Sequence, residues 1–280
     1  MRVSPSITQK IAKAMLFAAC ASAIAALLFV IGFVLVGGLK NVTWAFLTQP
    51  ILDMGRAGGI LPAIVGTLLM VMVAIGIAAP LGVASAIYLA EYTLEGKTTA
   101  AIRFGINCLA GVPSIIFGLF GFILFVVILG FGWSILSGGL SLAAMILPTV
   151  IRTAEEALRS VPQNYRDVAA SLGATRWQVV TRAVLPYALP GILTGVILGI
   201  GRSIEETAVV IFTAGSAVQM PASLFDSART MAVHFYILAR EGVSNENAYA
   251  TAAILIMTIL FINISAYTMM HRLMRGRRAA

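Results

Sequence analysis

Charged residues are scarce in this sequence. Only 11% of its 280 residues are Asp, Glu, Lys or Arg, whereas 60% are hydrophobic. A soluble chain of this length could not cover its surface with so few charges, because apolar side chains would have to face water instead. The shortage excludes a soluble globular protein and indicates an integral membrane protein.

Residues that bind metals or carry out redox chemistry are also rare. The cysteines and histidines stand alone, so no metal-ligand or redox spacing exists. They are Cys20, Cys108, His234 and His271. The stretch EGKT at Glu95–Thr98 ends like a phosphate-binding P-loop, but Glu91 occupies the place of that loop's first glycine. The chain is therefore expected to bind no cofactor, to hold no metal and to catalyse no reaction.

Long apolar runs follow one another along the chain. A run of about 20 residues can cross a bilayer as a helix. The stretch GFGWSILSGGLS, Gly130–Ser141, divides one of the runs into two. The predicted spans are Ala14–Val36, Ala57–Ala90, the two parts of Phe104–Ile151, Ala183–Ser216 and Asn247–Met270. The predicted fold class is an all-α membrane protein with six transmembrane helices.

The first apolar run needs to be distinguished from a targeting signal. Basic residues precede it, and LFAAC at Leu16–Cys20 faintly resembles a lipoprotein cleavage box. The run continues well past Cys20, however, and is long for the apolar region of a signal peptide. We therefore expect an uncleaved transmembrane helix.

Lys and Arg are distributed unevenly between the two sides of such a bundle. With the N-terminus inside, the inner segments hold Arg2, Lys10, Lys13, Lys97, Arg103, Arg152, Arg159, Arg166, Arg176, Arg182, Arg272, Arg275, Arg277 and Arg278. The outer loops hold only Lys40, Arg56, Arg229 and Arg240. Because cytoplasmic segments carry the excess of Lys and Arg, both termini are expected in the cytoplasm. The net charge of +8 then reflects membrane orientation and not binding to nucleic acid.

Two further patterns concern helix packing. Gly191, Gly195 and Gly199 form a small-residue ridge that lets helices approach closely. The outer loop 217–246 carries apolar residues at helical spacing, namely Leu224, Ala228, Met231, Phe235 and Leu238. This spacing predicts either a short interfacial helix or a helix that plugs the outer mouth.

Charges occur within the fifth span. The stretch GRSIEET, Gly201–Thr207, contains Arg202, Glu205 and Glu206, although each charge inside a span costs about 2.5–3.5 kcal/mol on insertion scales. Arg202 and Glu206 are four residues apart on one helix face, where they can pair. A polar clamp between helices and the lining of a transport pathway both explain the pattern. The pathway is favoured, because the planar fork of Arg suits an oxyanion.

A compact polar segment connects the fourth and fifth spans on the inner side. Ser160 and Gln163 fit a capping box that starts a helix running to Leu172. Gly173 follows, where a left-handed C-terminal cap is expected. The pattern predicts a helix that ends at a glycine turn.

A second helix is predicted after this turn. Thr175 and Gln178 fit another capping box, and Pro186 marks the expected end of the helix. The two helices then form either a hairpin that lies on the lipid headgroups or a rigid knob that docks on a partner.

The hairpin resembles the cytoplasmic loop of binding-protein-dependent ABC importer permeases, which reads E-A-A-x3-G-x9-I-x-L-P. The matching positions are Asp167, Val168, Ala169, Gly173, Ala183, Leu185 and Pro186. Asp replaces Glu, Val replaces the first Ala, and Ala replaces Ile. In that family this loop is a coupling helix that fits a groove on the ATP-binding subunit. The resemblance implies an ATPase coupling loop at about 160–186, with site residues Asp167, Ala169, Ala170, Gly173, Ala174 and Arg176.

Three more stretches resemble the phosphate-specific permeases of this family, and the PstA type more than the PstC type. They are LAEYT (Leu89–Thr93), AGVPSIIFGLFG (Ala110–Gly121) and the run Pro186–Ala208. The family pattern around Arg202 is R-A-x-G-E-T, and in this chain Glu205 stands in place of its Gly. The resemblance, which covers Ile60–Tyr267, implies a translocation pathway formed by Arg202, Glu205, Glu206 and Thr207. The additional acid leaves open whether the cargo is ordinary phosphate and in which protonation state it passes.

The resemblance also implies an architecture and a location. The fold is the type I ABC importer permease fold, in the inner (plasma) membrane of a prokaryotic cell. Residues 1–59 comprise the cytoplasmic N-terminus, the first transmembrane helix and an outer loop. Residues 60–272 form the permease core with five transmembrane helices, and residues 273–280 form a basic cytoplasmic tail.

The implied function is that of a permease subunit in an ATP-driven phosphate importer. The expected partners are the lipid bilayer, a second permease chain of the PstC type, two ATP-binding subunits that hold ATP and Mg, and an extracytoplasmic phosphate-binding protein. Import of sulfate, molybdate or phosphonate is an alternative, and so is an ATP-independent channel or secondary transporter. The last two are less favoured, because the sequence lacks the two similar halves common in secondary transporters and a channel needs no cytoplasmic hairpin.

Overall fold

Helices make up almost all of the regular structure. A computed structural model describes residues 5–278, with side chains described for residues 9–270, so Arg2 of the predicted inner set lies outside the described residues. The long helices are α1 (Pro5–Leu39), α3 (Leu61–Ile87), α6 (Ile135–Arg159), α9 (Leu185–Glu205) and α12 (Asn245–Arg278). The shorter elements are α2 (Trp44–Thr48), β1 (Ile51–Leu52), the 3-10 helix η1 (Asp53–Gly55), β2 (Ala57–Gly58), the π-helix η2 (Tyr88–Tyr92), α4 (Lys97–Ala110), α5 (Ser114–Gly121), the π-helix η3 (Phe122–Ile128), α7 (Gln163–Ser171), α8 (Arg176–Gln178), the π-helix η4 (Val179–Val184), α10 (Ala208–Thr213) and α11 (Met231–Arg240).

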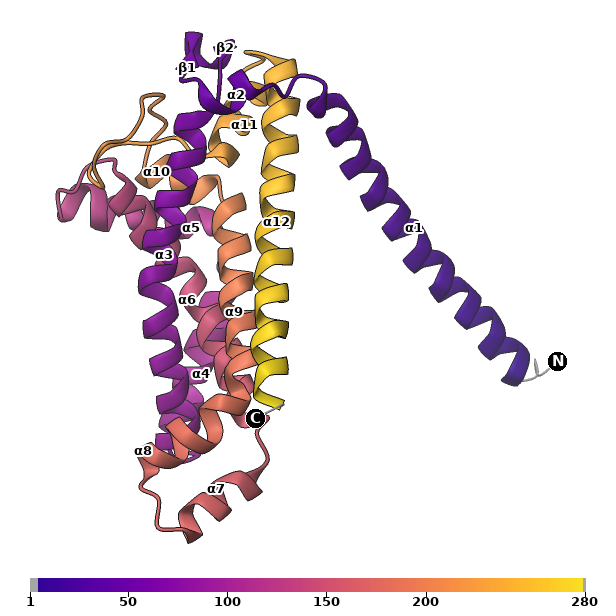
Figure 1. Ribbon diagram of the computed structural model, residues 1–280, viewed down its shortest axis with the longest axis vertical. Helices are drawn as coiled ribbons and strands as arrows, with labels where there is room; N and C mark the ends of the chain where they lie inside the picture. The colour runs from indigo at the N-terminus through magenta and orange to yellow at the C-terminus, as the bar shows by residue number, and fades with distance from the viewer. Residues whose placement is uncertain (1–4, 279–280) are drawn as a thin grey trace.

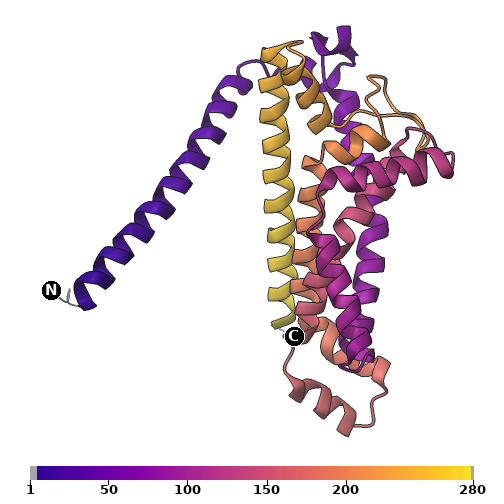
Figure 2. The same ribbon diagram turned by 180° about the vertical axis from the view of Figure 1, so that it is seen from behind.

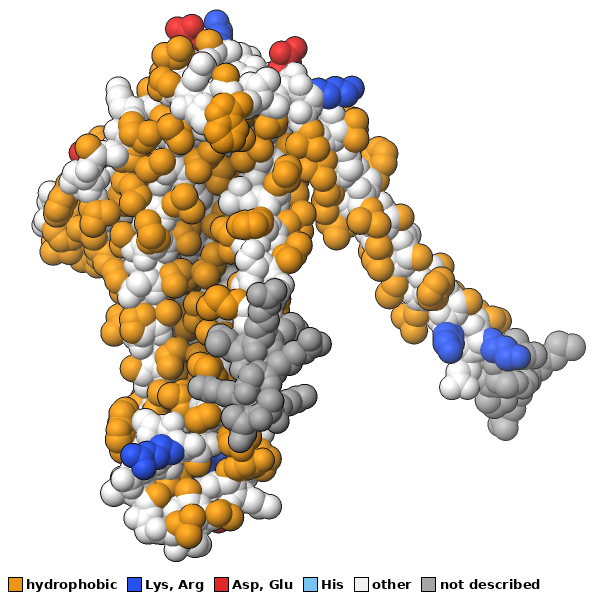
Figure 3. All heavy atoms as spheres, in the orientation of Figure 1, with side chains coloured by type: hydrophobic (Ala, Val, Ile, Leu, Met, Phe, Trp, Pro, Cys, Tyr) orange, Lys and Arg blue, Asp and Glu red, His pale blue; other side chains and the backbone are white. Residues whose placement is uncertain are grey.

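The long helices other than α1 run together along the molecule. Figures 1 and 2 show α3, α6, α9 and α12 side by side, with α7 and α8 beyond one end of the bundle and the antiparallel pair β1–β2 at the other. The described start of α1 and the described end of α12 both lie toward the end that carries α7. On the face drawn in Figure 3, hydrophobic side chains cover the middle, and charged side chains lie toward the ends. This is the distribution that a membrane-spanning bundle requires.

The number of predicted spans agrees with the structure, but one of the spans is bent. Helices long and apolar enough to cross a membrane are Gln9–Leu39, Leu61–Tyr92, Ile135–Arg159, Arg176–Glu205 and Asn245–Met270. The third predicted span is instead a bent pair, Lys97–Ala110 and Ser114–Ile128, whose axes meet at 97°. Counted as one span, this pair brings the total within residues 5–278 to 6. The predicted boundaries near residues 59 and 272 stay predictions.

The bend was not predicted, and Pro113 explains it. Proline lacks a backbone N–H and disfavours the helical conformation of the residue before it, here Val112. Helix α4 accordingly ends at Ala110, and α5 begins at Ser114 directly after Pro113. The break after this span is also shorter than predicted. The Ser134 hydroxyl accepts the N–H of Ser137 at 3.1 Å, so α6 starts inside the glycine-rich stretch.

Close packing joins α6 to α9. A Cβ added to Gly191 would lie 2.5 Å from the Ala157 Cβ, and one added to Gly195 would lie 2.8 Å from the Thr153 Cβ. Real Cβ atoms do not approach so closely, so these two glycines let the helices touch. The packing role predicted for the ridge is confirmed for both, whereas Gly199 has room for ordinary contact, at 3.5 Å.

The outer loop 217–246 contains a helix that is buried in the bundle. Helix α11 begins only at Met231, so the predicted helical repeat from Leu224 is too long, and its buried face includes Val233 and Leu238. His234 is 1% exposed, and its Nδ1 lies 3.3 Å from Nη1 of the buried Arg229. Burial, and then the nearby Arg229 charge, lower the pKa of His234 from 6.5 to about 4. The burial of α11 favours the plug over the interfacial helix.

Helix α1 stands away from the rest of the bundle. Its apolar window is 0% buried, and Figure 1 shows it meeting the bundle only near the outer loops. At that meeting point Phe33 stacks edge-on against Tyr249 of α12, with ring centroids 5.9 Å apart. Most of this apolar helix therefore needs lipid or another chain to cover it.

Candidate functional site

The charged stretch of the fifth span lies at the end of a helix. Helix α9 ends at Glu205, and Glu206 has an extended backbone with ψ 127°. The Glu206 carboxylate accepts the N–H groups of Ala208 and Val209 at 3.1 and 3.3 Å, and so caps α10. A single helix over Ala183–Ser216 was therefore a wrong prediction, because this cap favours a break. The predicted pairing of Arg202 with Glu206 was also wrong, since among residues 9–270 no hydrogen bond or ion pair joins them.

These charges line a cavity of about 640 Å³. Its walls are the 110–114 turn between α4 and α5, the end of α9 and one face of α12. The lining residues are Ala110, Gly111, Val112, Pro113, Ser114, Ile197, Leu198, Gly201, Arg202, Glu205, Glu206, Ile259 and Asn263. Arg202 is half-buried and Glu205 is exposed. The structure thus brings together three of the four predicted pathway residues, while Thr207 lies outside the lining, at the start of α10.

The cavity combines donors and acceptors that suit a polar anion. Arg202 carries a fixed positive charge and a planar fork of donors. Ser114 adds a hydroxyl and the start of α5, where backbone N–H groups lack helical acceptors. The Asn263 amide can donate and accept. Sequence reasoning missed Ser114 and Asn263 as lining residues. The signal for Asn263 was an amide in the middle of the last apolar span.

The first half of the hairpin folds largely as predicted. Gly173 has φ +80°, the left-handed conformation expected of a C-terminal cap, and the Ala174 N–H donates to the Ala169 carbonyl at 3.2 Å. The capping box at Ser160 was a wrong prediction. The Ser160 hydroxyl instead donates to the carbonyl of Ala157 at 2.8 Å, at the C-terminal end of α6. The residue at the N-cap position of α7 is Pro162, whose side chain cannot cap the helix.

The second half of the hairpin leads directly into the membrane. The predicted capping box is confirmed, because the Thr175 N–H donates to Gln178 Oε1 at 2.9 Å and the Gln178 N–H donates to the Thr175 hydroxyl at 3.3 Å. The predicted end near Pro186 was wrong. Pro186 lies in the first turn of α9, directly after the π-helix η4, and the helical path continues past it. The hairpin is therefore joined to α9 through α8 and η4 without a loop.

Two faces of the hairpin differ in chemistry. Asp167, Ala170, Ala174 and Arg176, all predicted coupling residues, line a cavity of about 220 Å³ between α7 and η4. Apolar side chains point into solvent instead at Val168, Leu172 and Trp177, which are 62%, 84% and 63% exposed. An exposed apolar group of this kind marks an interaction surface. Sequence reasoning named Val168 as a motif position and Leu172 as a helix end, but it did not identify this apolar surface.

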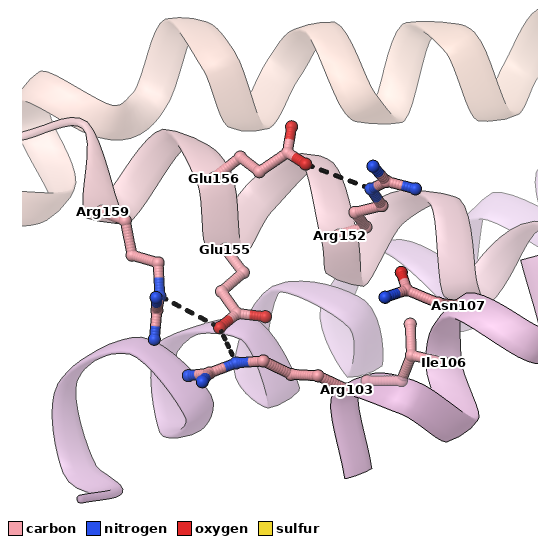
Figure 4. Close-up of a pocket in the computed structure, with 7 residues that line it drawn as sticks. All are labelled: Arg103, Ile106, Asn107, Arg152, Glu155, Glu156 and Arg159. Carbon is pink, nitrogen blue, oxygen red and sulfur yellow. Dashed lines mark hydrogen bonds and ion pairs between the residues drawn. The ribbon is translucent and has the colours of Figure 1, made fainter. Parts of the chain in front are cut away.

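A network of ion pairs holds the same end of the bundle together. Figure 4 shows Glu155 of α6 between Arg103 of α4 and Arg159, with N–O distances of 2.7 and 3.2 Å. Glu95 joins the network from the turn before α4, pairing with Arg159 and, at 2.9 Å, with Arg103. Hydrogen bonds from Arg159 and then Arg103 hold the pKa of Glu95 below its usual range. The Arg152–Glu156 pair, at 3.1 Å, is exposed.

Comparison with protein families matches residues 78–279 to the family described as binding-protein-dependent transport system inner membrane component. The chain is 33% identical to "Probable ABC transporter permease protein YqgI" of Bacillus subtilis (strain 168), covering 93% of this chain and 94% of that one. It is 33% identical to "Phosphate transport system permease protein PstA 1" of Mycobacterium tuberculosis (strain ATCC 25618 / H37Rv), covering 97% and 90%. It is 37% identical to "Phosphate transport system permease protein PstA" of Pasteurella multocida (strain Pm70), covering 76% of each chain.

Solved structures share the fold. A chain of the bacterial alginate ABC transporter, crystallised with an alginate-bound periplasmic protein, has a TM-score of 0.70 at 17% identity and covers 98% of both chains. A chain of the inward-facing MetNI methionine ABC transporter has a TM-score of 0.62 at 20% identity, covering 74% of this chain and 93% of that one. The fold is that of type I ABC importer permeases, as predicted.

Proposed function

Because the chain belongs to the family of binding-protein-dependent transport system inner membrane components, and is thus a transport subunit of an ABC importer, we propose that its cargo is inorganic phosphate. The cavity beside Arg202 carries this proposal, since it places one fixed positive charge among hydroxyl, amide and carboxylate groups within a membrane bundle. Phosphate offers both oxygens that accept from Arg and, when protonated, hydroxyls that donate to a carboxylate. The names of the phosphate permease relatives support the same cargo.

ATP binding and hydrolysis belong, in this proposal, to two separate subunits that dock on the hairpin. The exposed Val168, Leu172 and Trp177 supply the apolar contact area, and Gly173 and the Thr175 capping box keep α7 and α8 in a fixed relation. Closure of those subunits on ATP pushes the hairpin. Since η4 continues into α9, the push reaches Arg202 along one helix.

A second permease chain of the PstC type completes the pathway. The uncovered length of α1 supports this, because an apolar helix that is 0% buried can pack against another chain within the bilayer. An extracytoplasmic phosphate-binding protein delivers the cargo on the side of β1, β2 and α11. The chain then lies in the inner membrane of a prokaryotic cell, with both termini in the cytoplasm.

The test is reconstitution of the purified complex. The chain is isolated in mild detergent with the proteins that accompany it, inserted into vesicles, and supplied with binding protein outside and ATP inside. ATP-dependent uptake of labelled phosphate that excess sulfate and molybdate do not compete for is the expected result. Uptake of sulfate, molybdate or a phosphonate in place of phosphate would refute the cargo assignment. Recovery of the chain without any ATPase would refute the docking role of the hairpin.

A further inference from the structure

The hairpin is fastened to the bundle by a partly buried arginine of α7. The side chain of Arg166 is 17% exposed and that of its partner Glu91 is 7% exposed. Arg166 Nε donates to Glu91 Oε2 at 3.1 Å, and Nη2 donates to Oε1 at 2.6 Å. Two parallel charge-assisted bonds of this kind fix orientation as well as distance.

The same guanidinium also closes the end of α6. Its Nη1 donates to the carbonyl of Val161 at 2.7 Å, and its Nη2 donates to the carbonyl of Leu158 at 2.9 Å. Carbonyls at the end of a helix lack helical donors. The Leu158 carbonyl also accepts the Val161 N–H at 3.3 Å, so Arg166 adds a second donor there and fastens the end of the helix. One side chain of α7 thus joins η2, which continues α3, to the end of α6.

The main other contacts of α7 are with its own hairpin and the start of α9. No residue of α7 is fully buried. It packs mainly against η4, and its Tyr165 ring lies 4.4 Å from the ring of Tyr187. Among residues 9–270, the hydrogen bonds that run from α7 to η2 and to the end of α6 all come from Arg166.

We propose that Arg166 and Glu91 are positioning residues that make α7, η2 and the end of α6 move as one body. A displacement of α7 then turns α3 and α6 together. Helix α6 touches α9 at Gly191 and Gly195, so the motion reaches the helix that carries Arg202 by a second route besides η4. This inference rests on the proposed function in one respect, that an ATPase moves α7.

A distance measurement tests the rigid connection without any cargo. Spin labels are placed at Asn164→Cys in α7, outside the apolar docking surface, and at Leu81→Cys in α3, both exposed positions, with Cys20 and Cys108 replaced by Ser. Pulsed electron paramagnetic resonance on the purified complex should give a narrow distance distribution, unchanged by ATP and vanadate. Adding Glu91→Ala should broaden or shift it. A distribution as narrow and as constant as that of the parent would overturn the proposal.

A transport measurement separates positioning from a general structural role. In Glu91→Ala, phosphate carried per ATP hydrolysed should fall by about tenfold or more, because lost charge-assisted hydrogen bonds change populations by such factors. Assembly and ATP hydrolysis should stay within about twofold of the parent. Glu91→Asp, which keeps the carboxylate, should recover most of the coupling. If assembly, hydrolysis and uptake fall together, the pair is merely structural and the proposal is wrong.

The matched control is Glu156→Ala, which removes the exposed Arg152–Glu156 pair at the same end of the bundle. It should change neither the label distance nor the coupling, and an effect equal to that of Glu91→Ala would overturn a specific role for Arg166. If the parent complex carries no phosphate, the proposed cargo is wrong, while the distance measurement still decides the connection.

Discussion

Replacing Gly173 by Val should loosen the hairpin through backbone strain alone. Gly173 has φ +80°, and no atom lies within 4 Å of a Cβ built there, so the substitution creates no clash. An L-residue in the left-handed conformation costs about 1–2 kcal/mol, and a β-branched one at least as much. That energy corresponds to a change of about 5–30-fold in the population of the docking-competent hairpin. Asn tolerates this conformation and is the matched control.

The assay is titration of the purified ATP-binding subunit onto the detergent-solubilised permease pair. Gly173→Val should weaken docking by about 5–30-fold, whereas Gly173→Asn should stay within about threefold of the parent. Equal affinities for the two variants would refute the reasoning from backbone strain. Unchanged affinity in Gly173→Val would refute the docking role of the hairpin itself.

Three further outcomes are expected. Gly121→Ala should lower the free energy of unfolding by about 1–3 kcal/mol, because the added Cβ would lie 2.0 Å from the Ser141 Oγ. Thermal unfolding measures the loss, and Gly76→Ala, whose added Cβ meets open space, should show none. His234 takes up a proton near pH 6.5 in the unfolded chain and only near pH 4 in the folded chain. The free energy of unfolding should therefore fall as the pH falls between these values, by about 2 kcal/mol at pH 5. An equal loss in His234→Gln, which cannot be protonated, would contradict this cause. At a pH where phosphate is fully ionised, Glu205→Gln should speed its uptake by about twofold at low salt and less at high salt, because the carboxylate that repels this anion is removed and salt screens the repulsion. A difference that does not depend on salt would argue against repulsion.

Local signals in the sequence predicted local structure well. Apolar runs of sufficient length gave the spans, Gly173 gave a left-handed turn, and Thr175 with Gln178 gave a capping box, because each of these depends on neighbours within a few residues. The charges near Arg202 were recognised as unusual, and the stretch Ala110–Gly121, which includes Ser114, was recognised by its resemblance to the phosphate-specific permeases. Their meeting in one cavity was not predicted, since it depends on where α9 and α5 pack.

Two of the failures share a physical cause, because the same side chain could form either of two local hydrogen bonds of similar strength. Glu206 was placed in a helix by its spacing, but its carboxylate caps the following helix instead and ends α9. Ser160 had the pattern of an N-cap, yet its hydroxyl bonds back to the preceding turn. The Arg166–Glu91 contact joins residues 75 positions apart, and no short pattern in a single sequence specifies such a pair.

The central claim, that phosphate passes the cavity beside Arg202, is tested most directly by Arg202→Ala in the reconstituted complex. The charge does not hold another side chain by any described ion pair or hydrogen bond, so the variant should assemble and hydrolyse ATP normally. Phosphate uptake should fall by at least about a hundredfold, because a buried charge-assisted contact with the passing anion is lost, and Arg202→Lys should restore only part of it. Normal uptake in an assembled Arg202→Ala complex would contradict the account.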